Sequence, residues 1–548
     1  MNNNSKLFSP IKVNSVELKN RLVMAPMATR YATYGGYVTE RMVRYYKERA
    51  LGGVGLITVE ATNVTVEGAG WPNNLAAYND TYIDGLKKLT EAIHEGGAKA
   101  SLEIFHAGRR ALSGVIFQQP IAPSAIPTKN GEVPREMTIM EIEATADAFI
   151  QSARRANDAG FDAVNLHMAH GYLIQQFLSP LSNHRNDQYG GGTFQRCKFA
   201  VDILKGVRRE LGTNYPIICR LTVEEGLQAG INLDEGKKIA QILADAGADM
   251  IDVSAGGAES PHLTVQPMSM PRGCLVHLGE GIKKSIDIPV SIVGRISTPE
   301  LAEDILSNDK ADMVVIGRPL LADPQFPIKA MEGHNKEIRT CIACNHGCSG
   351  RLSSNMEVSC LVNPRVGREM ILPEGKAKIC KKVMVVGGGP AGMEAAATLA
   401  ERGHNVFLVE RKPYLGGQGL LAGKLPHKEE FLTHINYQIE RLERLDVDVM
   451  LQTEFSRELI SKIGPDVIIE ATGAEPLIPN IEGLETANVY NAWEVIERDL
   501  KNKWQKVVII GGGEVGCETA ELLSKKGIEV IIVEYLSVVA GKMSSRDR

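Results

Sequence analysis

The sequence lacks the features that would place it at a membrane or on a nucleic acid. No uninterrupted apolar run is long enough to cross a bilayer, and Met1–Phe8 is rich in Asn and has no apolar core of a secretion signal. There is no basic excess, because 61 Lys and Arg stand against 66 Asp and Glu, a formal net charge of −5. Nucleic-acid-binding proteins usually carry clustered positive charge. We therefore expect a cytoplasmic protein with neither a membrane nor a nucleic acid as partner.

Aromatic residues and early cysteines are also scarce. Aromatic residues make up 5% of the chain, whereas there are 54 glycines, a balance that favours an α/β fold over a bundle or sandwich. The 548 residues exceed what one hydrophobic core usually organises, so two or more domains are expected. No cysteine precedes Cys197, and four of the nine lie between Cys341 and Cys360. Without a secretion signal, this clustering indicates a metal rather than disulfides.

From Arg21 to about Leu321, short apolar runs alternate with amphipathic stretches of helical period, which is the pattern of repeated βα units. The predicted strands are Val23–Thr29, Val54–Thr62, Ala100–His106, Ala163–Met168, Pro216–Val223, Met250–Ser254, Pro289–Val293 and Met313–Gly317. The predicted helices between them include Tyr82–Glu95, Glu141–Ala159 and Leu233–Ala246. Eight such units predict an N-terminal TIM (β/α)8 barrel.

Beyond Pro324 this periodicity ends and further domains are expected. Four cysteines lie in a loop rich in Gly, Ser and Asn, and a polar linker follows. The order strand, glycine turn, helix, strand then occurs twice, as in Rossmann folds. We divide the chain into a barrel with the substrate site (1–335), a four-cysteine segment and linker (336–380), a first dinucleotide-binding domain (381–490) and the start of a second (491–548).

Both Rossmann openings carry the GxGxxG frame that binds a pyrophosphate at a helix N-terminus. The first consists of Gly387, Gly389 and Gly392 with the acid Glu410, and the second of Gly511, Gly513 and Gly516 with the acid Glu534. The separation between the last glycine and the acid is the same in both. A carboxylate at this position accepts a hydrogen bond from a free ribose 2′-hydroxyl and repels a 2′-phosphate, so NADH is favoured over NADPH.

The tandem motifs, with Ala471-Thr472-Gly473 between them, resemble the flavoprotein disulfide reductases, in which an FAD domain hosts a nested NAD domain. The resemblance implies that the first motif, with Gly416-Gly417-Gln418, holds FAD and the second holds NADH. After Glu534 the chain continues only from Tyr535 to Arg548, too few residues to complete both domains. The expectation is therefore an incomplete last domain, with an external electron donor as an alternative supply.

Cys341, Cys344, Cys348 and, after a longer gap, Cys360 offer four thiolates from one loop. Four cysteines can bind a zinc ion or a [4Fe-4S] cluster. Zinc ribbons usually carry two CxxC pairs on separate turns, whereas three close cysteines and one distant cysteine favour the iron–sulfur cluster over zinc or structural thiols. His346 in the same loop is interpreted as a neighbour of the metal rather than a ligand.

Polar residues follow the fourth predicted strand, where His167, His170 and Tyr172 lie within a few residues of one another. In a barrel, residues at the carboxyl ends of the strands face the active-site mouth. Two histidines can donate hydrogen bonds to a carbonyl oxygen, and a phenol can give a proton to carbon. Any one of them alone could be a structural residue at the rim, but three together favour a catalytic site.

This segment, with Leu7–Lys12, Asn20–Met27, His106–Arg109 and Gly317-Arg318, resembles the Old Yellow Enzyme family over nearly the whole barrel. With the cysteine loop and nucleotide motifs, the chain resembles the branch containing 2,4-dienoyl-CoA reductase, 2-enoate reductase and the gut bacterial bile-acid and steroid enoate reductases. The resemblance implies an FMN-bearing barrel that reduces the carbon–carbon double bond of an α,β-unsaturated carbonyl compound.

The same resemblance implies roles for individual residues. His167 and His170 would bind the substrate carbonyl and Tyr172 would donate the proton, while His262 would support it or line the pocket. The residues implied for FMN are Pro26, Met27 and Ala28 along the flavin, Glu103 and Arg220 at its pyrimidine edge, and Gly294, Arg295, Gly317 and Arg318 at the phosphate.

Glu103 departs from the family pattern, which commonly has glutamine there. A carboxylate beside an electron-rich reduced flavin disfavours reduction unless it is protonated or paired with Arg220. The related amine dehydrogenases share this replacement, so a trimethylamine-dehydrogenase-like activity is the alternative interpretation. Those enzymes attach FMN to a cysteine early in the barrel, and this chain has no cysteine before Cys197.

We therefore expect NADH to reduce FAD, electrons to pass through the cluster to FMN, and FMN to reduce a small unsaturated carbonyl substrate. Enoates, enoyl-CoA thioesters and steroid or bile-acid enones are all compatible with these motifs as substrates. A homo-oligomer is also compatible with the sequence. The remaining alternative is an FMN barrel fed by an external donor.

Overall fold

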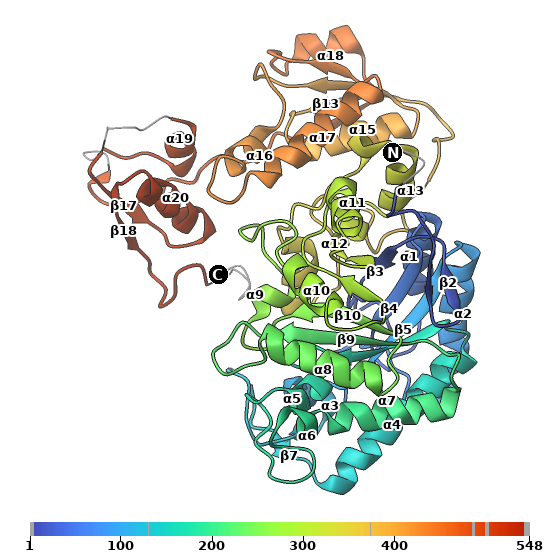
Figure 1. Cartoon of the computed structure of the whole chain (residues 1–548). Helices are drawn as coiled ribbons and strands as arrows, with labels where there is room; N and C mark the ends of the chain where they lie inside the picture. Colours follow the sequence, from blue (N-terminus) through green and yellow to red (C-terminus); the bar gives the residue numbers. More distant parts are fainter. Residues whose placement is uncertain (1–4, 130, 373, 485–487, 499–503, 542–548) are drawn as a thin grey trace. The chain divides into compact units, whose positions relative to one another are not determined.

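The computed structural model describes residues 5–129, 131–372, 374–484, 488–498 and 504–541. The chain divides into two units, Met1–Leu372 and Pro373–Arg546, and each is described by itself (Figure 1). Within the described ranges, no helix is both long enough and apolar enough to cross a membrane.

Eight parallel strands close into a barrel in the first unit, in the order β10-β11-β12-β3-β4-β5-β8-β9. Their bounds are β3 (Leu22–Met24), β4 (Leu56–Asn63), β5 (Lys99–Phe105), β8 (Ala163–Met168), β9 (Ile217–Glu224), β10 (Met250–Ala255), β11 (Val290–Ile292) and β12 (Met313–Ile316). The predicted TIM (β/α)8 barrel is confirmed. The first strand ends at Met24 rather than at Thr29, because Pro26 has no N–H to give to a strand ladder.

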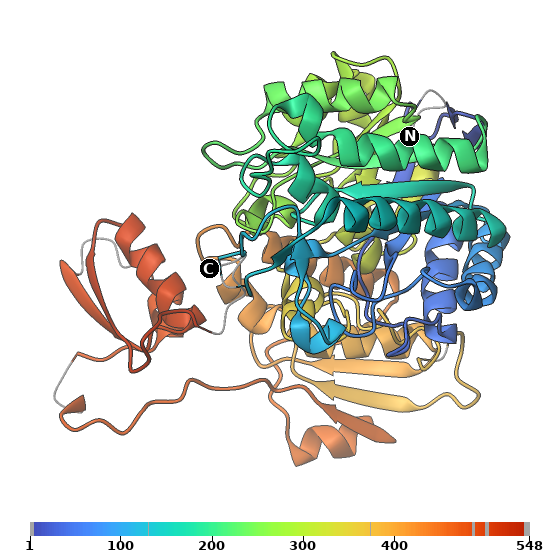
Figure 2. The same ribbon diagram turned by 90° about the horizontal axis from the view of Figure 1, so that it is seen from below.

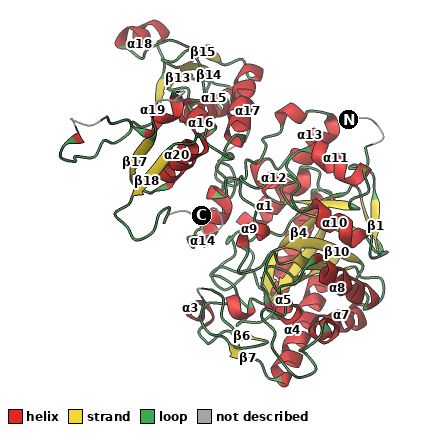
Figure 3. Cartoon of the chain, turned by 60° about the vertical axis from the view of Figure 1, so that its left-hand side comes forward, coloured by secondary structure: helices red, strands yellow, loops and turns green. Residues whose placement is uncertain are grey.

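Helices surround the strands, as the red and yellow elements of Figure 3 show. The longer ones are α1 (Glu40–Leu51), α2 (Ile83–Glu95), α4 (Ile139–Asp158), α7 (Lys198–Leu211), α8 (Leu233–Asp245), α10 (Val276–Lys283) and α11 (Pro299–Ser307). The shorter ones are α3 (Ser113–Ile116), α5 (Leu173–Leu178), α6 (Thr193–Arg196), α9 (Pro261–Thr264), α12 (Arg318–Ala322), α13 (Phe326–Glu332) and α14 (Arg351–Ser353). The three helices named from the sequence are confirmed to within two residues at each end.

Local sequence explains where the longest of these helices begins. At the start of α4, the Thr138 hydroxyl accepts from the Glu141 N–H while the Glu141 carboxylate accepts from the Thr138 N–H. This reciprocal capping box satisfies two backbone donors that a helix start would otherwise leave unpaired. Capping therefore fixes the first turn of α4 without help from the core.

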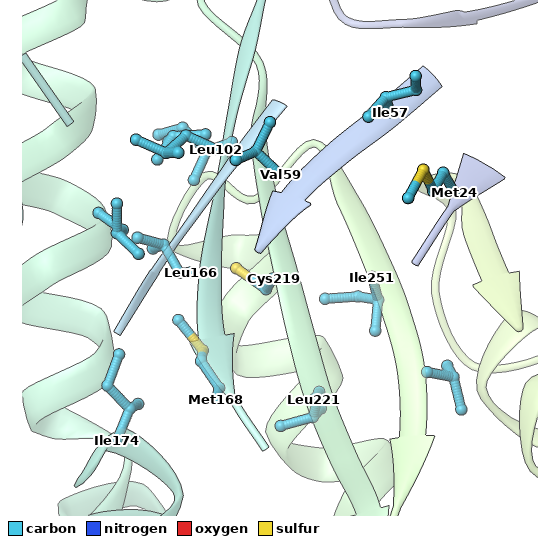
Figure 4. Packing of buried hydrophobic residues seen from close by; sticks show 14 of the residues in the cluster. Met24, Ile57, Val59, Leu102, Leu166, Met168, Ile174, Cys219, Leu221 and Ile251 are labelled. Atoms are coloured by element: carbon cyan, nitrogen blue, oxygen red, sulfur yellow. The ribbon is translucent and has the colours of Figure 1, made fainter. Parts of the chain in front are cut away.

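The two-residue period of the strands separates two cores. On β9, Cys219 and Leu221 pack outward in the same cluster as Leu166 of the adjacent β8 and Leu102 of β5 (Figure 4). Ile218 belongs instead to a smaller cluster with Met250 and Met313. A hairpin of β1 (Ile11–Val13) and β2 (Val16–Leu18) adds Val13 and Leu18 to this smaller cluster. The apolar side chains thus fill the amino-terminal end of the barrel and leave its other end for polar residues.

The segment after the barrel is bound to the barrel's first helix and loop. The Val358 N–H donates to the Thr29 carbonyl at 3.1 Å, and the Tyr31 hydroxyl donates to the Val358 carbonyl at 2.7 Å. Further along, Arg49 of α1 forms an ion pair with Glu369 at 3.1 Å, and both side chains are almost fully buried. The four-cysteine segment is therefore packed as part of the first unit.

The second unit contains two parallel sheets. The larger has the order β15-β14-β13-β16, and the smaller pairs β17 with β18. The strands are β13 (Lys382–Val386), β14 (Asn405–Val409), β15 (Asp448–Met450), β16 (Val467–Glu470), β17 (Lys506–Ile510) and β18 (Glu529–Val533). The helices are α15 (Pro390–Glu401), α16 (Gly417–Ala422), α17 (Glu430–Arg444), α18 (Arg457–Ile463), α19 (Ala492–Glu497) and α20 (Glu514–Lys525). Figure 2 shows α20 beside β17 and β18, and both sheets have the expected Rossmann-like βαβ order.

The buried Arg49–Glu369 pair gives a stability prediction. Glu369→Gln leaves a guanidinium that is 1% exposed without its counter-charge, so the free energy of unfolding should fall by about 3 to 5 kcal/mol. Urea denaturation followed by circular dichroism measures this change. The control is Glu357→Gln, which breaks the exposed Arg41–Glu357 pair between the same two segments and should change stability by less than about 1 kcal/mol. Equal losses in the two variants would contradict the prediction.

Candidate active site

A row of polar residues crosses adjacent strands in the carboxyl-terminal half of the barrel. The strand register pairs Glu103 with Asn165, His167 with Arg220, Arg220 with Asp252, and Asp252 with Ser291. All of these residues are buried. Residues that lie at the same height on their strands, and whose side chains point to the same face of the sheet, form one layer of a barrel. Glu103 and Arg220, expected at the flavin, therefore belong to a larger polar layer.

Arg220 is the positive charge at the centre of this layer. Its Nη1 donates to Glu103 Oε2 at 3.1 Å, and its Nε lies 3.5 Å from Asp252 Oδ2. Burial raises the pKa of Glu103 to about 7 although the Arg220 charge opposes the shift, and burial also raises the pKa of Asp252. The sequence reasoning missed Asp252. The sequence feature that could have identified it is an aspartate within the predicted strand Met250–Ser254, whose residues Met250, Ile251 and Val253 are apolar.

The loop after β8 has a strained backbone that directs the expected catalytic residues. His170 and Gly171 have φ values of 62° and 75°, a left-handed conformation that side chains other than glycine rarely adopt. The Gly171 carbonyl accepts from Gln176 Nε2 at 2.7 Å, and the Gly171 N–H donates to Gln175 Oε1. Gln175 in turn donates to the buried Glu225 at 2.9 Å. These side chains hold the conformation of the loop.

The structure brings His167, His170 and Tyr172 together. The His167 ring lies 5.0 Å from the His170 ring and 4.8 Å from the Tyr172 ring, centroid to centroid. His170 Nε2 is 2.8 Å from the Ser254 hydroxyl. Burial lowers the pKa of His167 well below its usual value, and the charges of Arg220 and Arg110 act in the same direction. His167 is therefore a neutral hydrogen-bonding group at physiological pH.

His262 does not join this group. It lies on α9 with an exposed side chain, and within the described chain no hydrogen bond or ring contact connects it to Tyr172. The same loop contributes Glu259, which forms an ion pair with the buried Arg109 at 3.0 Å. The expected supporting role of His262 has no contact that favours it.

The residues expected at the flavin phosphate lie where β11 and β12 end. Gly294 has φ 131°, and a Cβ there would come within 2.9 Å of Leu275. A Cβ on Gly317 would lie 3.0 Å from the Met27 sulfur, so this glycine lets the segment after β3 approach the end of β12. Arg318 donates to the Asn345 side chain at 2.7 Å, and Arg295 donates to the Met268 carbonyl at 3.0 Å. Pro26 is buried, and Met27 and Ala28 are half-buried.

Buried polar atoms without hydrogen-bond partners show whether this end of the barrel is suited to binding a flavin. Arg220 Nε, Asn165 Oδ1 and Ser101 Oγ are buried and have no hydrogen-bond partner in the described part of the chain. Buried polar groups normally have partners, so these atoms are available to hydrogen-bond a bound ligand. A pyrimidine ring offers both donors and acceptors, and the residues present therefore fit FMN. Asn165, which is paired with Glu103 across the two strands, was not among the residues expected at the flavin.

The four cysteines lie in one loop that includes a π-helical turn, η4 (His346–Gly350). Burial raises the pKa of Cys360 to about 12, and the nearby Cys341 and Cys348 thiols raise it further. A Cβ on Gly347 would lie 2.8 Å from the Cys360 backbone, so glycine is needed for this approach. The Ala343 N–H points at Cys341 Sγ at 3.4 Å, as backbone donors do at thiolate sites. His346 is exposed.

Within the described residues, no group of three or more His, Cys, Asp or Glu side chains is placed closely enough to hold a metal ion. The four thiols of this loop are the donor set present, and such a set can hold either a zinc ion or an iron–sulfur cluster.

The first glycine motif of the second unit has the close approaches that a dinucleotide cradle needs. Gly387 has φ 110°, and a Cβ on Gly392 would lie 1.8 Å from the Gly387 carbonyl oxygen. A Cβ on Gly417 would lie 2.9 Å from Gly389, so Gly417 packs directly over the turn. The Gly388 N–H donates to the Glu410 carboxylate at 2.6 Å. Gln418 donates to the Ala474 carbonyl at 3.3 Å, beside the same turn.

The second glycine motif repeats this geometry. Gly511 has φ 99°, a Cβ on Gly516 would lie 1.9 Å from the Gly511 carbonyl oxygen, and nothing lies within 4 Å of a Cβ on Gly513. The Gly512 N–H donates to the Glu534 carboxylate at 2.7 Å. Both motifs therefore form the same turn, in which the acid orders the glycine backbone. Each acid retains lone pairs for a ribose hydroxyl.

Comparison with known proteins agrees with this architecture. The sequence profile described as the NADH:flavin oxidoreductase / NADH oxidase family matches residues 6–337. The chain belongs to this family. A second profile, pyridine nucleotide-disulphide oxidoreductase, matches residues 381–547. The expected Old Yellow Enzyme barrel, fused to a nucleotide-binding disulphide-oxidoreductase part, is thereby confirmed.

Curated relatives and solved structures cover nearly the whole chain. A NADH oxidase of Thermoanaerobacter brockii is 44% identical, over 99% of this chain and 84% of the relative. A cinnamate reductase of Clostridium sporogenes is 37% identical, over 96% of this chain and 82% of the relative. A 2-naphthoyl-CoA reductase structure has a TM-score of 0.94 at 33% identity, covering 98% of this chain and 84% of that one. This family member is a flavin and NADH oxidoreductase of the 2-enoate reductase class.

An amine-oxidising enzyme is also similar. The structure of histamine dehydrogenase from Rhizobium sp. 4-9 has a TM-score of 0.89 at 26% identity, covering 98% of this chain and 81% of that one. The family thus includes both reductases and dehydrogenases on one scaffold. The fold alone does not select the direction of the reaction.

The raised pKa of Glu103 gives a prediction for pH dependence. The folded-state pKa of about 7 lies above the ordinary value, so folding takes up a proton between about pH 4.5 and about pH 7, and stability falls as the pH rises through that window. Glu103→Gln removes this effect. Its stability relative to the parent should rise by up to about 3 kcal/mol from pH 5 to pH 8.

Thermal and urea denaturation of both proteins across this range measures the difference. Glu95→Gln, which changes an exposed carboxylate of α2, is the control and should show no such trend. Parallel pH curves for Glu103→Gln and the parent would mean that Glu103 keeps an ordinary pKa.

Proposed function

We propose that this protein reduces the carbon–carbon double bond of an α,β-unsaturated carbonyl compound, with a hydride from FMN and a proton from Tyr172. The observation that carries the proposal is the grouping of His167, His170 and Tyr172 beside the buried Glu103–Arg220 pair. The similarity to a cinnamate reductase supports it.

FMN, when bound, supplies the hydride for the β-carbon of the substrate. Arg220, Glu103 and Asn165 would hold its pyrimidine edge, because these are the buried polar groups of that layer. The expected ring contacts are Pro26, Met27 and Ala28. The phosphate would lie at the ends of β11 and β12, among Gly294, Arg295, Gly317 and Arg318, where such barrels bind phosphates.

The two histidines would polarise the substrate carbonyl. His167 is neutral and buried, so it can donate one hydrogen bond without bringing a charge. His170 is oriented by Ser254. Donors placed where negative charge develops contribute roughly 2 to 4 kcal/mol each to lowering the barrier. Tyr172 packs against both the His167 ring and the Phe105 ring, and its hydroxyl would protonate the α-carbon.

The second unit and the cysteine loop would supply electrons. The two glycine motifs would hold FAD and NADH, which supply reducing equivalents, and Cys341, Cys344, Cys348 and Cys360 would hold a [4Fe-4S] cluster, whose chemistry is single-electron transfer. Glu410 and Glu534 would each accept from a ribose hydroxyl, which favours NADH over NADPH. An external donor is the alternative supply for the barrel.

One observation favours a second function. Glu103, which forms an ion pair with Arg220, stands where the family commonly has glutamine, a replacement that the related amine dehydrogenases share. Histamine dehydrogenase has the same scaffold. Anaerobic titration distinguishes the two activities, because trimethylamine would bleach the oxidised flavin whereas an enone or enoate would reoxidise the reduced flavin.

The cluster proposal predicts the effect of losing one thiolate. Cys344→Ser should lower the iron content from about four per chain to well below that value and abolish the visible charge-transfer absorption. Iron analysis and absorption spectroscopy measure both. The control is Cys380→Ser, because Cys380 is exposed and lies outside the loop. Stoichiometric zinc in the parent protein, with no iron, would refute the cluster.

The proton-donor role of Tyr172 predicts a kinetic split. Tyr172→Phe should leave flavin reduction by NADH unchanged and slow reoxidation by an unsaturated carbonyl substrate by about 100- to 10,000-fold, the usual contribution of a general acid. Stopped-flow absorbance resolves the two half-reactions. An unchanged reoxidation rate would exclude Tyr172 as the acid.

A further inference from the structure

Arg110 differs from the other guanidinium groups around the candidate active site. Arg109 is paired with Glu259 at 3.0 Å, and Arg220 with Glu103 at 3.1 Å. Within the described part of the chain, no carboxylate lies within ion-pair distance of Arg110. Arg110 is half-buried, so its charge is only partly screened by water. An incompletely solvated cation without a counter-ion indicates an anionic ligand.

The position of Arg110 points to the substrate. It ends the short turn η2 (Gly108–Arg110) that follows β5, at the carboxyl-terminal end of the barrel. Its Nη1 donates to the His170 carbonyl, and its guanidinium carbon lies 4.7 Å from the centre of the Tyr172 ring. The side chain is therefore fixed against the two residues proposed to bind and protonate the substrate. A guanidinium has five N–H groups, and this hydrogen bond uses one.

The other polar groups that the structure describes at the candidate active site supply no free positive charge, so the charge of Arg110 matters for binding an anion. His167 is neutral, because burial and the two nearby guanidinium groups lower its pKa. The buried layer below contains two carboxylates, Glu103 and Asp252, against Arg220. Neither group adds positive charge for a second anion. Among the described residues, Arg110 contacts both His170 and Tyr172 and has no carboxylate partner, so it can neutralise a negatively charged substrate.

An unsaturated carboxylate is the substrate that needs such a cation most. Hydride addition to its β-carbon moves an electron pair onto a carboxylate that is already negative, and protonation of the α-carbon then gives the saturated carboxylate. A neutral ketone or thioester develops a single negative charge, for which two neutral donors are adequate. A guanidinium beside the carboxylate oxygens offsets the second charge through charge-assisted hydrogen bonds.

Tyr172 also packs against a buried apolar cluster. Phe105 meets the Tyr172 ring edge-on at 5.1 Å and stacks on Trp71 at 5.4 Å between ring centres. Ala61, Ala107 and Ile116 belong to the same cluster. A cation over the Tyr172 ring and apolar packing against the same ring suit an amphipathic carboxylate.

We propose that Arg110 binds the substrate carboxylate and selects anionic α,β-unsaturated carboxylates over neutral enones. This proposal rests on the proposed reductase function and adds the charge of its substrate. Arg110 acts by direct contact with the substrate.

The test compares an anionic and a neutral substrate of the same shape, cinnamate and 4-phenyl-3-buten-2-one. In Arg110→Gln, the ratio of kcat/KM for cinnamate to that for the ketone should fall about 100-fold, as expected when one partner of a desolvated charge pair is lost. Arg110→Lys should recover part of the ratio. The control, Arg135→Gln, removes a positive charge from an exposed ion pair of the same unit and should leave the ratio unchanged.

A binding measurement separates this proposal from the proposed function. Titration of the oxidised holoenzyme with 3-phenylpropanoate, followed by the flavin difference spectrum, should give a Kd that rises about 100-fold in Arg110→Gln, while the Kd for 4-phenylbutan-2-one changes far less. Equal changes for both ligands, or an unchanged kcat/KM ratio, would overturn the role of Arg110. If the parent protein reduces neither substrate, the reductase function fails. The binding titration then still decides whether Arg110 recognises a carboxylate.

Discussion

The ion pair between Arg220 and Glu103 is the interaction on which the organisation of the barrel depends. Its two members come from β9 and β5 and are both almost fully buried, so each charge offsets part of the desolvation cost of the other. Asp252, which also lies beside Arg220, adds a second carboxylate to the layer. Two buried carboxylates facing one guanidinium are energetically unfavourable unless a proton or a ligand compensates the extra negative charge. A polar layer of this kind divides the barrel interior, with apolar packing at one end and chemistry at the other.

The cysteine segment is held to that chemical end by short-range contacts with the barrel. Val358 pairs with Thr29, which directly follows the residues expected along the flavin. Arg318, expected at the flavin phosphate, donates to Asn345 between two of the cysteines. One set of loops therefore positions both candidate redox sites. This coupling gives a physical reason why the segment packs with the barrel rather than as a separate domain.

Sequence patterns predicted the barrel strands well because side-chain alternation and helical period are local properties. They also placed Tyr172, His167 and His170 correctly at one strand end. They left the role of His262 open, because a histidine in a loop after a strand can point either to the site or to solvent; its side chain is exposed, and its role stays a prediction. They overlooked Asp252 and Arg110. Asp252 matters because it forms an ion pair with Arg220 of another strand, and Arg110 because it has no carboxylate partner among the described residues.

By itself, the sequence determined the order of the elements, the two glycine turns, the four-thiolate loop and the family, because each is written in the spacing of neighbouring residues. Only the tertiary structure decided the charge pattern of the active site. It set Arg220 between two acids, gave Arg110 no acid partner among the described residues, and shifted the pKa of Glu103 to about 7. The physical reason is that these effects depend on burial and on distances between residues far apart in the chain, which no local pattern encodes.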